Sequence, residues 1–202
     1  MRKVILPLML SLDGYFEGPN HDLSWHNVDK EFNRFVIQQM KEVDLIIFGK
    51  RTYQMMESFW PQAQDDPKMS KENLIVARLM NNMNKIVISR TVNKIREHKN
   101  WKNVKIVHKF DPKEIMRLKK QPGKAIWVGG SNLALSFIGA GLIDEFRFTI
   151  NPVIIGVGTP VFKGLGRRLK LELIKTRKFR SGKVIQYYRP KKSPSRLIIA
   201  GG

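Results

Sequence analysis

The stretch "AIWVGGSNLALSFIGAG", residues 125–141, decides the fold class. Its apolar start is typical of a buried strand, and the letters GGSN separate that start from a second apolar run that ends at glycine. Residues 125–143 carry no charged side chain and would nearly span a bilayer. The Gly-Ser-Asn break instead predicts a short strand followed by a short helix. We therefore expect a buried β–α unit in a soluble α/β protein, with no membrane partner.

The same alternation of strand and helix patterns runs through the preceding sequence. Apolar, β-rich runs predict strands at residues 3–10, 44–49, 84–89 and 104–110. Helical patterns predict helices at residues 30–43, 50–59, 71–83 and 112–121. Asp111 precedes Pro112, and this pair predicts a capped helix with proline in its first turn. Such alternation indicates a largely parallel sheet.

The pattern changes after Gly141. Residues 144–156 alternate like a strand exposed on one face, and residues 169–179 and 183–190 flank a Ser-Gly turn like an antiparallel hairpin. The expected fold is α/β, with a mostly parallel central sheet, helices on both faces and an antiparallel C-terminal hairpin. We expect one domain over residues 1–190, followed by a basic and then apolar tail, 191–202, of unknown role.

Composition restricts the chemistry. A chain of 202 residues with 42% hydrophobic residues can bury the core of one domain. It has no cysteine, which excludes disulfides and thiolate chemistry and suits a reducing cytoplasm. The four histidines show no spacing typical of metal ligands, so we expect no metal. The start "MRKVILPLML" is better read as a first strand than as a signal peptide, because no small-residue cleavage site follows it.

The net charge of +20 favours anionic partners. Residues 163–192 hold twelve Lys or Arg and one acid, Glu172. This basic segment is either the solvated face of a surface hairpin or a nucleic-acid-binding surface. Few aromatic residues alternate with the cations, which counts against nucleic acid.

Three loops that follow strands carry groups suited to phosphate. In "FGKRTY", residues 48–53, a glycine, two cations and a hydroxyl open a helix, and "VISRT", residues 87–91, places Ser89 and Arg90 after a strand. In "WVGGSN", residues 127–132, paired glycines permit close backbone approach, and Ser131 or Asn132 is expected to cap the next helix. A plain helix start, a turn and tight packing would explain each loop singly. Ligands of open parallel sheets bind at the carboxyl ends of strands, where all three loops are expected.

The turn "SLDGYFEG", residues 11–18, follows the first strand and holds an acid, two glycines and two aromatic residues. Together with the three loops and with "GLIDEFRFTINPVIIGVGTPVF", residues 141–162, it resembles the dihydrofolate reductase-like superfamily. The chain is most similar to small stand-alone relatives of the reductase domain of bifunctional riboflavin-biosynthesis deaminase-reductases. The resemblance covers residues 3–190.

This resemblance implies an NADPH-dependent reductase that forms a homodimer. The implied cofactor-binding residues are Gly49, Lys50, Arg51 and Thr52 at the adenosine phosphates, Ser89 and Arg90 at the adenosine end, and Gly129, Gly130, Ser131 and Asn132 at the pyrophosphate. None of these loop positions is acidic, so NADPH should be preferred to NADH.

The same resemblance places the first turn over the nicotinamide and the substrate. Asp13 is the implied proton donor, or the group that orients it, and Phe16 could pack on a planar ring. Tyr15, Trp25 and Asp29 are further candidates for substrate contact, although Asp29 could equally cap a helix.

Two positions depart from the riboflavin-pathway pattern. Members of that pathway usually have a lysine after the Asp-Gly and a glutamate before the paired glycines, where this chain has Tyr15 and Val128. We therefore expect reduction of another small heterocyclic or carbonyl-like substrate. The alternatives are the riboflavin-pathway reduction of 5-amino-6-(5-phosphoribosylamino)uracil and a non-catalytic nucleic-acid-binding role.

Overall fold

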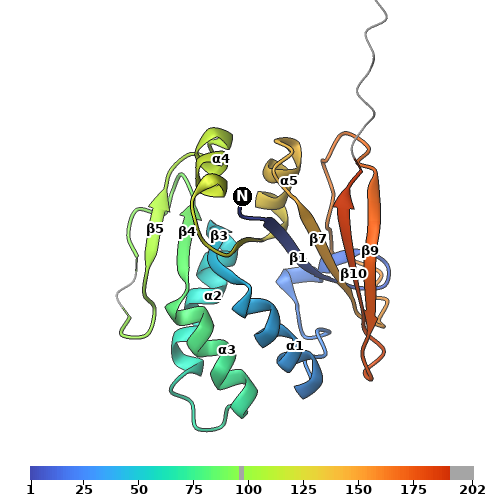
Figure 1. Cartoon of the computed structure of the whole chain (residues 1–202). Coiled ribbons are helices and arrows are strands. Elements are labelled where there is room, and N and C mark those ends of the chain that lie inside the picture. The colour runs from blue at the N-terminus through green and yellow to red at the C-terminus, as the bar shows by residue number, and fades with distance from the viewer. Residues whose placement is uncertain (96–97, 192–202) are drawn as a thin grey trace, which may run out of the picture.

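The computed structural model describes residues 1–95 and 98–191 (Figure 1). Within these residues the large sheet has the strand order β5-β4-β3-β6-β1-β7-β10-β9. Its strands are β1 (Val4–Leu10), β3 (Val43–Gly49), β4 (Asn84–Ile88), β5 (Val104–Val107), β6 (Ala125–Gly129), β7 (Glu145–Ile150), β9 (Leu171–Lys178) and β10 (Val184–Pro190). The pairings from β5 to β7 are parallel, whereas β10 pairs antiparallel with both β7 and β9. The predicted mostly parallel sheet with an antiparallel hairpin is confirmed.

Helices cover both faces of this sheet, as the sequence predicted (Figure 1). One face carries α1 (Lys30–Lys41), α2 (Lys50–Ala63) and α3 (Lys71–Asn82), and the other carries α4 (Pro112–Lys120) and α5 (Ser131–Gly139). Alternate residues of β3 divide between the two layers, because successive side chains of a strand point to opposite faces. Ile46 packs with α1 to α3, and Ile47 packs with α5.

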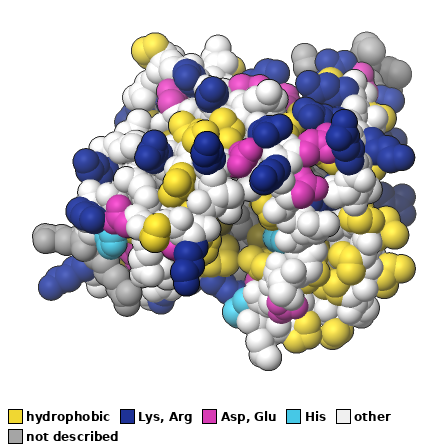
Figure 2. All heavy atoms as spheres, turned by 90° about the horizontal axis from the view of Figure 1, so that it is seen from below, with side chains coloured by type: hydrophobic (Ala, Val, Ile, Leu, Met, Phe, Trp, Pro, Cys, Tyr) yellow, Lys and Arg dark blue, Asp and Glu magenta, His cyan; other side chains and the backbone are white. Residues whose placement is uncertain are grey.

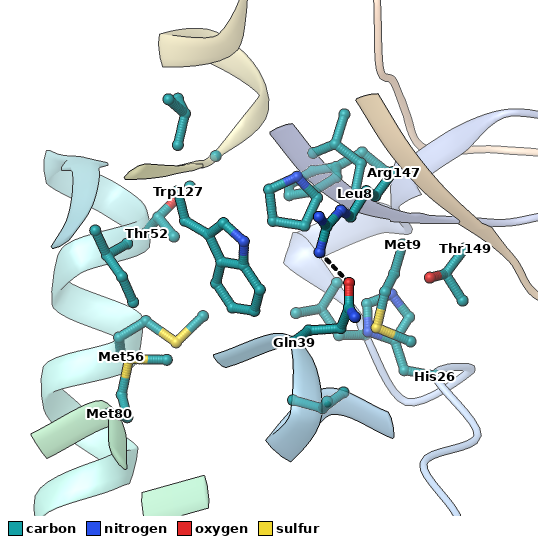
Figure 3. Close-up of a pocket in the computed structure, with 18 of the residues that line it drawn as sticks. Leu8, Met9, His26, Gln39, Thr52, Met56, Met80, Trp127, Arg147 and Thr149 are labelled. Atoms are coloured by element: carbon teal, nitrogen blue, oxygen red, sulfur yellow. Dashed lines mark hydrogen bonds between the residues drawn. The ribbon is translucent and has the colours of Figure 1, made fainter. Parts of the chain in front are cut away.

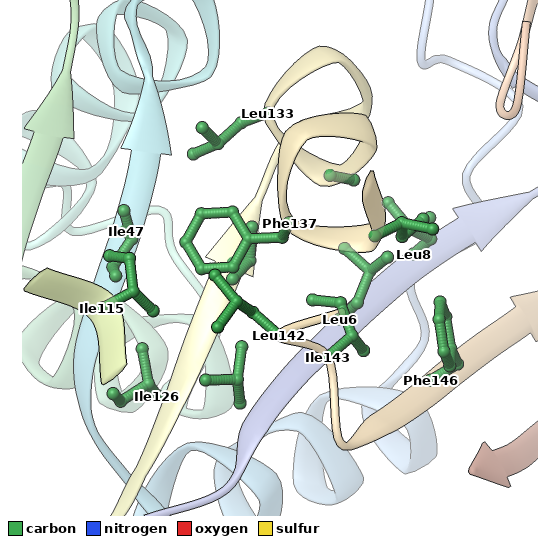
Figure 4. Packing of buried hydrophobic residues seen from close by; sticks show 14 of the residues in the cluster. Leu6, Leu8, Ile47, Ile115, Ile126, Leu133, Phe137, Leu142, Ile143 and Phe146 are labelled. Carbon is green, nitrogen blue, oxygen red and sulfur yellow. The ribbon is translucent and has the colours of Figure 1, made fainter. Parts of the chain in front are cut away.

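The core under α5 holds the uncharged segment that decided the fold class. Phe137 and Ile138 of α5 are buried against Leu6 of β1 and Ile126 of β6 (Figure 4). Phe137 is fully buried, and burial of a phenylalanine contributes roughly 1.5–3 kcal/mol to folding. The absence of charge in residues 125–143 thus reflects the centre of an α/β domain. None of the helices in residues 1–95 and 98–191 is long and apolar enough to cross a membrane.

Local capping explains where several helices begin. The Asp29 carboxylate accepts a hydrogen bond from the Phe32 amide at the start of α1. The Asp111 carboxylate accepts one from the Lys113 amide, and Pro112 occupies the first turn of α4, as predicted. Asp29 is therefore a helix cap, one of the two roles considered for it.

The strand expected over residues 144–156 differs from the observed one. β7 ends at Ile150, and it is buried on both faces: Phe146 and Phe148 pack in the core with α5, and Arg147 on the opposite face reaches Gln39 of α1. Its charged residues stay inside because Arg147 Nε donates to Glu145 Oε1 at 2.7 Å. Alternation of polar and apolar residues suggested a solvated face, but here the polar positions form a buried ion pair.

A small second sheet lies beside the large one. β2 (Tyr15–Glu17) pairs antiparallel with β8 (Thr159–Pro160), and a short 3-10 helix, Pro19–His21, follows β2. The first turn is thus partly a strand, which the sequence analysis did not predict. The pairing places the first turn against the loop after β7.

The C-terminal hairpin packs on the first helix. Phe179, Ile185 and Tyr187 form a cluster with Phe32 and Phe35 of α1. β9 is the outer strand, and its residues are almost all exposed. The predicted tail lies outside the described residues from 192 onward.

Candidate functional site

Two of the three predicted phosphate loops form one cleft. The cleft has a volume of about 430 Å³, and its walls include Gly49 to Thr52 at the start of α2 and Gly130 to Asn132 at the start of α5. β3 and β6 are neighbours in the sheet, so the loops at their carboxyl ends meet. Neither Gly49 nor Gly130 makes a side-chain cap, which leaves the N–H groups of both helix starts available to an anion.

The paired glycines allow these loops to touch. A Cβ on Gly129 would lie 2.7 Å from the Phe48 ring, and a Cβ on Gly130 would overlap the Thr52 hydroxyl. Gly130 also has a φ of 101°, which an L side chain rarely adopts. Gly130 itself caps α5, so the expectation that Ser131 or Asn132 caps this helix was wrong.

The third loop adjoins the cleft through Lys50. Lys50 Nζ donates to Thr91 Oγ1 at 3.0 Å, which ties the start of α2 to the loop after β4. The Ser89 hydroxyl is buried and accepts hydrogen bonds from the Thr91 and Val92 amides, so it shapes that turn. Arg90 is exposed on the same turn. The structure therefore brings all the predicted cofactor-binding loops to one edge of the sheet.

An acid also faces this cleft. Glu17 is buried, lines the cleft and lies 3.4 Å from Arg51 Nη2 and 3.1 Å from His21 Nδ1. The Thr159 hydroxyl donates to Glu17 Oε1 at 3.0 Å. The three loops lack acids, but β2 brings one to them, which loop composition could not reveal.

An apolar cavity of about 300 Å³ adjoins the cleft (Figure 3). The two hollows share lining residues, namely Phe16, Leu23, Thr52, Met55 and Gly130. Val128 forms part of the cavity wall, which also includes Met9, Phe32, Val36, Met56 and Met80. Figure 2 shows a hollow near the middle of the lower face, with hydrophobic side chains at its edges. A ligand in the cavity would therefore lie beside a ligand in the cleft.

Arg147 is the one charged residue among those lining the cavity in the described parts of the chain. Its guanidinium donates to Gln39 Oε1, to Glu145 Oε1 at 2.7 Å and to Glu42 Oε2 at 3.2 Å. Two carboxylates thus already compensate one cation. Arg147, Glu145 and Gln39 are buried, and the hydrogen bond from Arg147 holds the Gln39 side chain at the cavity wall (Figure 3).

Two ring nitrogens at the cavity wall are buried and make no hydrogen bond to the described protein atoms: Trp127 Nε1 and His26 Nε2. Burial and, more weakly, the nearby Lys183 ammonium lower the pKa of His26 to about 4, so this imidazole is neutral at pH 7. The Thr149 side chain also lines the cavity. These neutral polar groups, together with the Gln39–Arg147 pair, interrupt a mainly apolar wall.

Most of the site residues predicted in the first turn line neither the cleft nor the apolar cavity. The Asp13 carboxylate accepts from the Gly156 amide at 2.8 Å and from the Ile155 amide at 3.3 Å, and it lines neither hollow. The Ser11 hydroxyl, followed by these amides, holds the pKa of Asp13 below its ordinary value. A proton donor must be protonated and must face its ligand, and Asp13 satisfies neither condition in this structure.

The other substrate-contact candidates divide in the same way. Phe16 lines both hollows, whereas Tyr15, Trp25 and Asp29 line neither. The Tyr15 hydroxyl donates to the Gly156 carbonyl at 3.3 Å, and Trp25 Nε1 donates to the Asp22 carbonyl at 3.1 Å. Three further residues of the cavity wall, Gln39, Arg147 and Trp127, were not predicted from the sequence as site residues. Of these, only Arg147 gave a signal, as a lone cation in an apolar strand.

Part of the basic segment is used in packing. The Arg177 guanidinium lies 5.1 Å from the Phe35 ring centre and 4.8 Å from that of Phe179. Lys183 is fully buried, and Arg189 pairs with Glu172 at 2.7 Å. On the face seen in Figure 2, the Lys and Arg side chains are scattered, with acids between several of them. These contacts favour the hairpin-surface interpretation of the charge. In residues 1–95 and 98–191, no group of three His, Cys, Asp or Glu could hold a metal ion.

Comparisons with known proteins agree with this architecture. The chain is 36% identical over 186 residues to the uncharacterized protein YyaP of Bacillus subtilis (strain 168), covering 91% of this chain and 92% of that one. The deaminase/5-amino-6-(5-phosphoribosylamino)uracil reductase of Thermotoga maritima superposes with a TM-score of 0.67 at 17% identity, covering 94% of this chain and 57% of that chain. Dihydrofolate reductase from Enterococcus faecalis, complexed with NADP(H), superposes with a TM-score of 0.59 at 14% identity, covering 94% and 97% of the two chains.

These likenesses establish a dihydrofolate reductase-like fold. The family described as the RibD C-terminal domain matches residues 2–185, nearly the whole of the described structure. This chain, with its two helix starts facing one cleft beside an apolar cavity, belongs to the RibD C-terminal domain family.

Proposed function

We propose that this protein is an NADPH-dependent reductase of a small heterocyclic or carbonyl-like substrate. The observation that carries the proposal is the shared wall between the anion-binding cleft and the apolar cavity. The anion-binding cleft suits the phosphates of a dinucleotide, and the apolar cavity suits a small organic molecule. Family membership and the NADP(H) complex of a protein with the same fold support this assignment.

In this proposal the two helix starts bind the phosphates of the cofactor. The N–H groups after Gly49 and Gly130 and the Lys50 ammonium supply hydrogen-bond donors, while the absence of a Cβ at Gly130 allows close approach. When bound, the nicotinamide supplies the hydride. Phe16, Thr52 and Met55 line both hollows and would hold the two reactants next to each other.

Titration of the purified protein with NADPH tests the proposal. Saturable binding is expected, measured by calorimetry at two salt concentrations because the net charge of +20 also attracts anions non-specifically. A matched titration with free pyrophosphate separates the phosphate contribution from the rest of the cofactor. Failure to bind NADPH at low and at moderate salt would refute the reductase assignment.

The riboflavin-pathway reductase is a second candidate, favoured by the family match and by the Thermotoga maritima enzyme. Against it, Val128 and Tyr15 supply no charge, and Arg147 is already paired with two carboxylates. A phosphoribosyl group would therefore find no uncompensated cation in the apolar cavity. Both candidates share the proposed cofactor and differ only in the substrate.

We also propose a homodimer in the cytoplasm, which gel filtration and cell fractionation would test.

A further inference from the structure

We propose that the apolar cavity takes an uncharged aromatic carbonyl compound and that Trp127 Nε1 donates a hydrogen bond to its carbonyl oxygen. Binding of such a compound, the recognition half, depends only on the cavity. Its reduction by hydride transfer, the reduction half, rests on the proposed reductase function. Three features of the cavity carry the argument: its charge, its unpaired donors and its walls.

The charge of the cavity excludes anionic ligands. Arg147, the one cation among the described residues that line the cavity, lies between Glu145 and Glu42, at 2.7 and 3.2 Å, so its charge is already compensated. His26 is neutral at pH 7 because burial lowers its pKa to about 4. A carboxylate or phosphate placed here would lose its hydration without gaining an ion pair.

The unpaired donor at the wall calls for an acceptor on the ligand. Trp127 Nε1 is buried without a partner among the described residues, and a buried donor left unpaired is costly. The indole lies on the side of the cavity with Thr52 and Met56, and its nitrogen points toward the Gln39–Arg147 pair (Figure 3). An indole nitrogen only donates, so its natural partner is an acceptor such as a carbonyl oxygen.

The walls select a flat apolar body. Three methionines, Met55, Met56 and Met80, line the cavity together with the indole, and so do Phe16 and Phe35. Thioethers and aromatic rings pack well on a planar ring system. A volume of about 300 Å³ suits a ligand of about two fused rings.

The position of Trp127 connects recognition with chemistry. It lies in β6 and lines the cavity, three residues before Gly130, which lines both the cavity and the cofactor cleft. In the proposed reduction, the carbonyl carbon would take the hydride that bound NADPH supplies, the π electrons would move to oxygen, and the oxygen would take a proton from solvent water. The ketone or aldehyde would leave as an alcohol, with the cofactor oxidised to NADP⁺. The indole N–H would stabilise negative charge that develops on this oxygen.

The test compares two nearly isosteric probes, acetonaphthone and naphthoate. They share the naphthalene ring and differ in a neutral methyl ketone against a carboxylate. Calorimetry of the full chain without cofactor should show acetonaphthone binding at least about 100-fold more tightly than naphthoate. Naphthoate binding equal to or tighter than acetonaphthone would overturn the proposal.

Trp127→Phe keeps an aromatic wall and removes the N–H. It should weaken acetonaphthone binding about 3- to 10-fold, the effect of one neutral hydrogen bond. Trp101→Phe is the matched control, because the Trp101 indole donates to the Tyr53 hydroxyl at 3.2 Å and does not line the cavity. It should lower the melting temperature and leave acetonaphthone affinity unchanged. Equal losses of affinity in both variants would contradict the role of Trp127.

Separate titrations with NADPH distinguish the two proposals. If acetonaphthone binds through Trp127 but NADPH does not bind, the recognition half stands and the reductase function fails. If NADPH binds but acetonaphthone does not, the reductase function stands and this inference fails. If both bind, oxidation of NADPH should depend on acetonaphthone, and its absence would refute the reduction half.

Discussion

Glu17 Oε1 lies 3.4 Å from Arg51 Nη2 across the candidate cofactor cleft. Arg51 belongs to the first turn of α2, and Glu17 ends β2, 34 positions earlier in the sequence. Glu17 and a bound phosphate would compete for Arg51, because a phosphate can approach the guanidinium only beside the buried Glu17 carboxylate. The selectivity of this cleft between NADPH and NADH therefore depends on both residues.

Removal of the Arg51 charge should weaken NADPH more than NADH. A hydrogen bond to a charged group contributes about 1.5–3 kcal/mol, and the existing ion pair with Glu17, which is exposed on the Arg51 side, offsets up to about 1 kcal/mol of it. We expect Arg51→Ala to weaken NADPH binding about tenfold, with a smaller effect on NADH. Glu17→Gln, which keeps the hydrogen bond from Thr159, should strengthen NADPH binding several-fold. Equal losses for both cofactors in Arg51→Ala would show that Arg51 does not contact the 2′-phosphate.

A side chain at Gly130 should close the cofactor cleft. A Cβ there would overlap the Thr52 hydroxyl, and the φ of 101° would be strained for alanine. We expect Gly130→Ala to reduce NADPH affinity by more than about tenfold and to lower the melting temperature. Gly139→Ala, in the last turn of α5 with open space around the new Cβ, is the control. It should bind NADPH normally and melt at the same temperature or slightly higher.

His26 should titrate far below its ordinary range. Burial, with a smaller effect of Lys183, lowers its pKa from 6.5 to about 4 in the folded protein. The unfolded chain therefore binds more protons between these values, so this residue makes the free energy of unfolding fall as the pH drops from about 6.5 to 4. NMR of the imidazole should show the low pKa directly. His26→Gln should lose stability less steeply over this interval, and parallel curves for both proteins would contradict the assignment.

This chain should not replace a riboflavin-pathway reductase in a cell that lacks one. The cavity offers the phosphoribosyl group no uncompensated cation, and Val128 replaces the acid usual in that pathway. We expect no growth when the chain is expressed in a riboflavin auxotroph that lacks the reductase. The Thermotoga maritima deaminase-reductase serves as the positive control, with expression of both proteins checked by immunoblot. Growth supported by this chain would favour the second candidate function.

The order of strands and helices could be predicted because it depends on local patterns. Apolar runs, Gly breaks and caps such as Asp111 act within a few residues, and they determined the α/β class, the hairpin and the strand ends that carry the three loops. The paired glycines signalled a close approach, which the structure finds at Phe48 and Thr52. These features are properties of short segments.

The walls of the site depended on contacts between distant segments. Arg147 pairs with Glu42, 105 positions away, and Thr159 donates to Glu17, 142 positions away. No local pattern shows that β7 is buried on both faces or that β2 brings an acid to the phosphate loops. The sequence by itself thus determined the elements and the loops at their ends. Only the tertiary structure decided which charges are compensated and which donors remain unpaired, because burial and pairing arise when the sheet assembles.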